Sequence, residues 1–179
     1  MYTFVVGNGP SAGKWLGVKL IPSIGCNIAI KDFDLTHLVC VDRLAMVEIR
    51  KLKPKLNTTY WCKKTVLEVP PGWNEFEIPG IDSGSAALHL AAELYPENEI
   101  IAIGFDGVLG LDNGNRYQYH FRPKPTPDAI RQRHLQTVLD ILPNIPRVQF
   151  VSYQKHELLE TIAYDQALKI AITQSRKLY

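Results

Sequence analysis

Long hydrophobic runs are missing from this sequence of 179 residues. No apolar stretch approaches the ~18 residues that a membrane-spanning helix requires, so no membrane segment is expected. Cysteine is scarce, since Cys26, Cys40 and Cys62 are odd in number and form no CxxC pair. Neither a disulfide framework nor a zinc site is therefore predicted. We expect a cytoplasmic protein whose thiols are reduced.

An excess of charge of one sign is missing as well. The chain has 20 Lys and Arg against 18 Asp and Glu, a net charge of +2 with neutral histidines. Affinity for nucleic acid depends on the neutralisation of many phosphates, so we expect no nucleic-acid partner. Hydrophobic residues make up 46% and charged residues 21%, as in globular proteins. The length fits one domain over residues 1–179.

Well-known catalytic and metal-binding motifs are also lacking. The sequence contains no Walker GxxxxGK(S/T) loop, no GxSxG turn and no HExxH helix. Asp106 and Asp112 are six residues apart, which does not match the spacing of an EF-hand loop. We therefore expect no metal site and no required cofactor.

Strand and helix signals alternate along the chain. Runs of β-branched, aromatic and aliphatic residues predict strands at residues 2–6, 23–30, 37–41, 65–69, 99–104 and 147–151. Apolar residues at helical spacing predict helices at residues 42–53, 84–95 and 128–142, and a C-terminal helix within 155–178. Residues 70–79 and 105–127 are predicted as loops. Strands separated by helices predict an α/β fold, with a doubly wound, mostly parallel, Rossmann-like sheet and helices on both faces.

A glycine-rich segment directly follows the first predicted strand. It consists of Gly7, Asn8, Gly9, Pro10 and Ser11. Ligands bind outside the carboxyl ends of parallel strands, and glycines let backbone N–H groups approach an anion. The segment also fits the loose dinucleotide pattern GxGxx(G/A), which needs an acidic residue after the second strand. Besides a nucleotide phosphate site, a NAD or flavin site and a turn that merely packs a helix on the sheet therefore stay open.

Other segments bring small or polar residues to the same edge of the predicted sheet. They contain Asn27, Asp42, Ser83 with Gly84, and Asp106. Their joint occurrence predicts a binding site at this edge. Ser83 and Gly84 begin a predicted helix, whose free N–H groups are able to bind a phosphate or a carboxylate. An ordinary N-cap is the alternative.

Aromatic and basic side chains gather in the loop after Asp106. They are Arg116, Tyr117, Tyr119, His120 and Arg122. Phenol and guanidinium groups bind phosphate oxygens, and imidazole accepts a proton near neutral pH. A phosphate site is therefore one interpretation, and a solvated loop with aromatic anchors is the other.

In their order along the chain, these motifs resemble the bacterial sialyltransferases of glycosyltransferase family 42. The motifs are Gly7-Asn8-Gly9-Pro10-Ser11, Cys26-Asn27, Ser83-Gly84 and Ile103-Gly104-Phe105-Asp106. The resemblance extends from Tyr2 to about Leu142. The first motif is also similar to a loop in proteins of the pterin pyrophosphokinase type.

The resemblance implies a Rossmann-like nucleotide-binding domain with a lid, which uses CMP-sialic acid and needs no metal. By this resemblance Asn8, Gly9 and Ser11 lie against the phosphate and ribose of the nucleotide. Asn27 contacts the nucleotide or the sugar, and Ser83 with Gly84 completes the pocket.

The resemblance also implies catalytic roles. Tyr117 or Tyr119 holds the leaving phosphate, and His120 deprotonates the acceptor hydroxyl. Two features depart from the family pattern. Asp42 stands where the family has an asparagine, and residues 106–126 are short for the family's lid.

Three functions are left open by the sequence. The first is glycosyl transfer from a CMP-sugar-type donor, and the second is non-catalytic binding of a nucleotide or nucleotide-sugar. The third is metal-dependent phosphotransfer of the pyrophosphokinase type, with Asp42, Asp106 and Asp112 as ligands of a divalent ion. The C-terminal helix has an apolar face that packs either on the sheet or on a second copy, in a homodimer.

Overall fold

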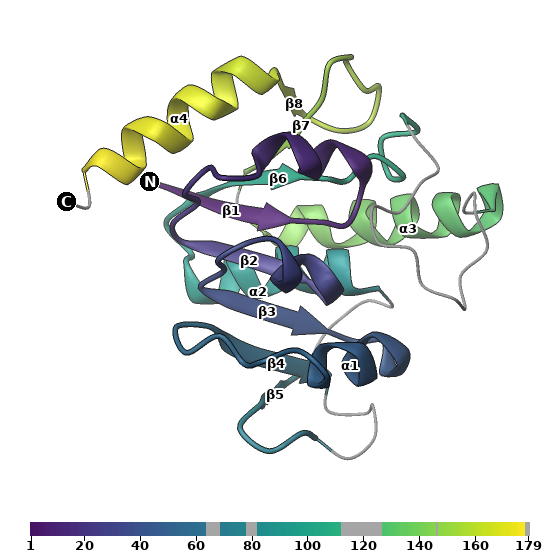
Figure 1. Cartoon of the computed structure of the whole chain (residues 1–179). Coiled ribbons are helices and arrows are strands. Elements are labelled where there is room, and N and C mark those ends of the chain that lie inside the picture. The colour runs from purple at the N-terminus through teal and green to yellow at the C-terminus, as the bar shows by residue number, and fades with distance from the viewer. Residues whose placement is uncertain (64–68, 78–81, 112–126, 146, 178–179) are drawn as a thin grey trace.

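A parallel β-sheet organises the chain in this computed structural model, which describes residues 1–63, 69–77, 82–111, 127–145 and 147–177. The described strands are β1 (Tyr2–Val6), β2 (Ser23–Cys26), β3 (His37–Cys40), β4 (Thr59–Lys63), β5 (Asn74–Phe76), β6 (Glu99–Ile103), β7 (Val148–Val151) and β8 (Thr161–Ile162). All pair in parallel, in the order β5-β4-β3-β2-β1-β6-β7-β8 (Figure 1). The chain therefore places β2 to β5 on one side of β1. It then crosses back and places β6 to β8 on the other side of β1.

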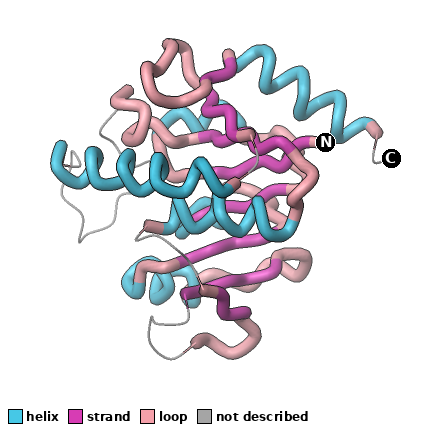
Figure 2. Tube along the Cα trace, turned by 180° about the vertical axis from the view of Figure 1, so that it is seen from behind, coloured by secondary structure: helices cyan, strands magenta, loops and turns pink. Residues whose placement is uncertain are grey.

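Helices cover both faces of this sheet, as a parallel sheet requires. The α-helices are α1 (Arg43–Arg50), α2 (Ser83–Leu94), α3 (Asp128–Ile141) and α4 (Tyr164–Arg176), and the 3₁₀ helices are η1 (Pro10–Trp15), η2 (Asn27–Lys31) and η3 (Leu142–Asn144). One apolar cluster joins η1, η2, α1 and α4 to the first face, and another joins α2 and α3 to the second. Figures 1 and 2 show these two layers from opposite sides. The predicted doubly wound α/β fold is confirmed.

The central strands are buried on both sides. In β1, Phe4 and Val6 belong to the cluster on the first face and Val5 to that on the second, all without exposed area. In β6, Ile101 belongs to the cluster on the first face and Ile100 to the cluster on the second. Strands of this kind have continuous apolar sequences, which is why both were predictable.

Several boundaries differ from the sequence prediction. The run predicted as a strand at 23–30 ends at Cys26, because Asn27 has a φ of +50° and begins η2. Strand β5 lies within the segment 70–79, which was predicted as a loop. The predicted strand at 65–69 lies outside the described residues except for its last position. Strand β4, which immediately precedes it, was not predicted.

The C-terminal helix begins at Tyr164 and not near residue 155. Leu159 and Ile162 occur at a helical spacing, but they pack on opposite faces of the sheet. Ile162 belongs to β8, which pairs with β7 before the helix begins. The spacing of apolar residues alone does not distinguish this short edge strand from the first turn of a helix.

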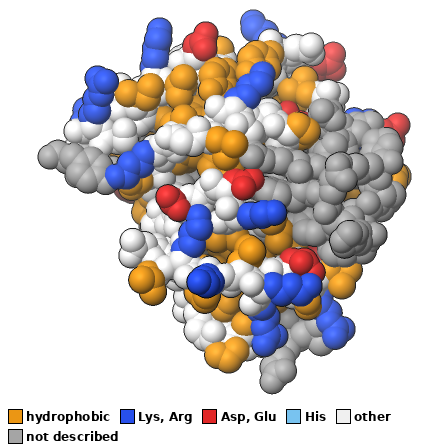
Figure 3. All heavy atoms as spheres, in the orientation of Figure 1, with side chains coloured by type: hydrophobic (Ala, Val, Ile, Leu, Met, Phe, Trp, Pro, Cys, Tyr) orange, Lys and Arg blue, Asp and Glu red, His pale blue; other side chains and the backbone are white. Residues whose placement is uncertain are grey.

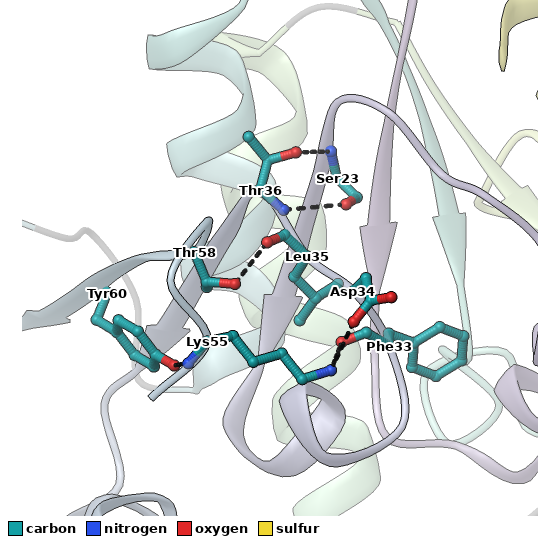
Figure 4. A network of polar contacts seen from close by, with 8 residues as sticks. All are labelled: Ser23, Phe33, Asp34, Leu35, Thr36, Lys55, Thr58 and Tyr60. Carbon is teal, nitrogen blue, oxygen red and sulfur yellow. Dashed lines mark hydrogen bonds and ion pairs between the residues drawn. The ribbon is translucent and has the colours of Figure 1, made fainter. Parts of the chain in front are cut away.

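Polar contacts tie together the loops that enter the strands. The Ser23 N–H donates to Thr36 Oγ1 at 3.1 Å, and the Thr36 N–H donates to Ser23 Oγ at 3.2 Å (Figure 4). Lys55 Nζ donates to the Phe33 carbonyl and to Asp34 Oδ1, both at 2.8 Å. These bonds fix the amino-terminal ends of β2 and β3. Because all strands are parallel, the residues that follow them lie at the opposite end, which we call the carboxyl edge of the sheet.

Helix α4 is joined to the start of β1 by one side chain. Gln174 Nε2 donates to the carbonyls of Tyr2 and Ile21, each at 2.7 Å, and Gln174 Oε1 accepts from the Tyr2 N–H at 2.9 Å. Ala167 and Ala171 pack against the sheet, as the apolar face of this helix predicted. The bonds of Gln174 therefore fix where α4 lies on that face.

Hydrophobic and charged side chains are mixed on the described part of this surface. Figure 3 shows hydrophobic side chains between Lys and Arg on the face that carries α1 and α4. Singly exposed apolar residues of this kind are normal on a protein surface. A homodimer through α4 stays a prediction. None of the helices in the described ranges has the length and apolar content to cross a membrane.

We expect Gln174→Ala to lower the free energy of unfolding by about 1–3 kcal/mol, because two carbonyls and one N–H lose their partner. Urea denaturation checks this value. Gln166→Ala is the matched control, since Gln166 is exposed on the same helix and such changes stay within about 0.5 kcal/mol. Equal stability of the two variants would show that Gln174 contributes nothing to docking.

His37 is held as a neutral ring between two aromatic residues. Trp61 Nε1 donates to His37 Nδ1 at 3.2 Å, and His37 Nε2 lies 3.0 Å from the Tyr95 hydroxyl. Burial lowers the pKa of His37 below its ordinary value of 6.5. Protonation would also replace the acceptor on Nδ1 by a second donor.

The stability of the protein is therefore expected to fall as the pH drops below about 6.5, towards the lowered pKa of His37. In that window the unfolded chain binds the proton and the folded chain does not, so protons favour unfolding. Urea denaturation at pH 7.5 and pH 5 measures the loss. His37→Gln removes this part of the pH dependence, whereas the control His134→Gln retains it. An unchanged slope in His37→Gln contradicts the prediction.

Candidate functional site

The loops after β1 and β6 lie at the point where the strand order reverses. In open α/β sheets this is where ligands bind. The Gly7 N–H donates to the Ile103 carbonyl at 2.7 Å, and the Gly9 N–H donates to the Gly104 carbonyl at 2.8 Å. A Cβ on Gly7 would lie 2.5 Å from Gly104 O, and one on Gly9 would lie 2.0 Å from Asp106 Oδ2. Both glycines are therefore needed for the close packing of the two loops.

A carboxylate of the chain itself lies at the beginning of η1. Asp106 Oδ2 accepts from the Ser11 N–H at 3.1 Å and from Ser11 Oγ at 2.8 Å. Pro10, which lacks an N–H, occupies the first position of η1 and is exposed. Asp106 thus occupies the place where the sequence pattern predicted the anion of a ligand, and a phosphate there would compete with it.

Asn27 connects the ends of β2 and β3 to the beginning of α2. Its Oδ1 accepts from Ser83 Oγ at 2.7 Å and from Cys40 Sγ at 3.1 Å. Ser83 Oγ in turn accepts from the Val41 N–H at 3.1 Å. Burial raises the pKa of the Cys40 thiol, so this thiol stays protonated and able to donate. Asn27 and Ser83 are buried, and each already has partners within the protein.

Two acceptors near these residues have no partner. Asn8 Nδ2 donates to Cys26 Sγ at 3.6 Å, but Asn8 Oδ1 is buried without a hydrogen bond. Asp82 is the N-cap of α2, and its Oδ1 accepts from the Ser85 N–H at 2.9 Å. Asp82 Oδ2 is also buried without a partner. Asp82 was not among the site residues predicted from the sequence, so this second oxygen was missed.

Contacts between neighbouring segments close a ring at the carboxyl edge, which we call the polar ring. Its contacts are Asn8 with Cys26, Asn27 with Ser83, Gly84 with Phe105, and Asp106 with Ser11. In the third contact, a Cβ on Gly84 would lie 3.2 Å from the Phe105 ring. The structure therefore brings together most of the polar residues that the sequence placed at this edge.

Asp42 has a different role from the other predicted residues. Its Oδ1 caps α1 by accepting from the N–H groups of Leu44 at 2.9 Å and Ala45 at 3.4 Å. In the described ranges, no three His, Cys, Asp or Glu side chains come together as ligands for a metal ion. Asp112, Arg116, Tyr117, Tyr119, His120 and Arg122 lie outside those ranges. Their suggested roles stay predictions.

Asn27 gives a direct test of how the polar ring is held. We expect Asn27→Ala to lower the free energy of unfolding by about 2–4 kcal/mol, because Ser83 loses its acceptor and alanine is strained at a φ of +50°. Asn27→Gly loses the same hydrogen bonds without the strain and is expected to cost about 1 kcal/mol less. Urea denaturation measures both, and equal losses would contradict the backbone argument.

Comparison with known proteins adds no relationship to this geometry. No family model matches the chain, and no curated protein or solved structure matches it significantly. The fold and the polar ring are therefore the observations on which a function has to be argued.

Proposed function

We propose that the polar ring binds a nucleotide and that the chain is a transferase for a CMP-sugar-type donor. The observation that carries the proposal is the convergence of Asn8, Asn27 and Ser83 at the carboxyl edge of the sheet. These side chains come from three segments far apart in the sequence. Such convergence at the switch point of a doubly wound sheet is typical of nucleotide-binding proteins.

The chemistry of the proposal follows from the resemblance to glycosyltransferase family 42. His120 takes the proton of the acceptor hydroxyl, whose oxygen forms a bond to the anomeric carbon of the donor sugar. The bond from that carbon to the phosphate oxygen breaks, and CMP leaves with the electron pair. Tyr117 or Tyr119 donates a hydrogen bond to the leaving phosphate and stabilises its charge.

Two of the three carboxylates that the pyrophosphokinase alternative needs as ligands have structural roles. Asp42 accepts from N–H groups of α1, and Asp106 accepts from Ser11 at the beginning of η1. Each carboxylate holds a structural position in the fold through one of its oxygens. Non-catalytic binding of the same nucleotide uses the same residues, and a turnover measurement distinguishes it.

A thermal-shift panel of CMP, CDP, UDP, GDP, ATP and NAD, each with and without magnesium, tests the nucleotide. We expect CMP at ~100 times its dissociation constant to add about 2.7 kcal/mol. That corresponds to a rise of about 5–10 °C in Tm for a chain of this size. The rise is expected to be independent of magnesium. A flat panel contradicts the proposal, and a shift only by ATP with magnesium favours phosphotransfer.

The catalytic step is tested with His120→Ala. We expect this variant to keep the thermal shift with CMP and to lose the release of CMP from a CMP-sugar by about 10²-fold or more, as removal of a general base does. His134→Ala, in α3, is the matched control and is expected to keep both. Binding without any turnover by the unchanged protein would assign the chain to the non-catalytic alternative.

A further inference from the structure

A groove lies between the last turns of α4 and the start of β1. Figures 1 and 2 show that α4 crosses the first face of the sheet and ends beside the N-terminus. The groove has a volume of about 530 Å³, within the range of about 300–1,000 Å³ that small-molecule sites occupy. Because Tyr2 begins β1, the groove lies at the amino ends of the strands, opposite the polar ring. The proposed function makes no use of this space.

The walls of the groove are mostly apolar. Met1 and Tyr2 line it from the start of the chain, and Ile170 lines it from α4. Tyr2 and Ile170 also pack against the apolar cluster of the first face. Gln174 contributes to the lining, but its side-chain amide is already bonded to Tyr2 and Ile21. This amide joins the two walls, so the groove is preformed.

The charged side chains at the groove all have the same sign. Lys169 and Lys177 line it, together with Thr173. These three residues follow one another at intervals of four along α4 and its C-cap, so Thr173 is a neighbour of both lysines. Within the described ranges, no Asp or Glu lines the groove and neither lysine has an ion pair. Two exposed cations therefore flank a largely apolar space.

We infer that this groove binds an amphipathic monocarboxylate with the straight apolar chain of a medium-chain fatty acid. The apolar chain lies against Tyr2 and Ile170 and gains affinity by leaving water. The carboxylate lies beside Thr173, where the ammonium groups of the two lysines donate charge-assisted hydrogen bonds to it. An amphiphile with a cationic head is repelled by the same lysines. The inference does not rest on the proposed function.

An NMR titration of the isotope-labelled protein with decanoate tests both the ligand and its place. We expect the amide signals of Tyr2, Ile170 and Thr173 to shift and to saturate in the millimolar range or below. Hexanoate has the same head and a shorter chain, and it is expected to bind about tenfold more weakly. Decylammonium has the same chain length and the opposite charge, and it is also expected to bind about tenfold more weakly.

The two lysines are tested with the double variant Lys169→Gln/Lys177→Gln. Both residues are exposed, so the fold is expected to be retained. We expect decanoate to bind this variant about fivefold to tenfold more weakly and to lose its advantage over decylammonium. Lys155→Gln/Arg176→Gln is the matched control, with the same change of net charge at exposed residues outside the groove. It is expected to bind decanoate as the unchanged protein does.

Three results would overturn the inference. Decanoate that shifts no amide signal at the groove shows that no such ligand binds there. Equal affinity for decanoate and decylammonium shows that the groove does not select a carboxylate. An equal loss of affinity in the two double variants shows that the overall charge of the protein, and not the pair of lysines, attracts the ligand. Because CMP takes no part in these measurements, a failure of the proposed function leaves their outcome unchanged.

Discussion

The close backbone approach between the loops after β1 and β6 determines the geometry of the whole carboxyl edge. The Gly7 N–H reaches the Ile103 carbonyl at 2.7 Å, and Gly104 adopts a φ of +74°. A Cβ on Gly104 would lie 2.8 Å from the Cβ of Ala12, which is one of the two buried side chains of η1. Only glycines allow this approach, and it fixes the position of Asn8 relative to the end of β2.

This packing changes the interpretation of the glycine-rich segment. The same sequence pattern that binds phosphate in other folds here receives an anion from its own chain, because Asp106 accepts from Ser11. The Ser11 N–H is therefore already paired within the protein. The glycine-rich segment therefore serves first to join the loops after β1 and β6.

The sequence predicted those parts of the structure that depend on local patterns. β1 and β6 are apolar on both faces, and α2 has a continuous run of small and apolar residues, so each was identified. The strands β5 and β8 at the two edges of the sheet were missed because they are short and mix polar with apolar residues. The pairing of Ser11 with Asp106 joins residues 95 positions apart. The spacing of residues along the sequence does not predict such a pairing. It also does not predict that one carboxylate oxygen of the N-cap residue Asp82 has no partner.

The hydrogen bonds of the polar ring pair most of its polar atoms but leave two oxygens without a partner. Asn27 and Ser83 satisfy one another and hold β2, β3 and α2 together. These bonds fix where Asn27 and Ser83 stand at the carboxyl ends of the strands. Asn8 Oδ1 and Asp82 Oδ2 have no bond to break. The ring is therefore fully hydrogen-bonded where it holds β2, β3 and α2 together, and less so at Asn8 and at the cap of α2.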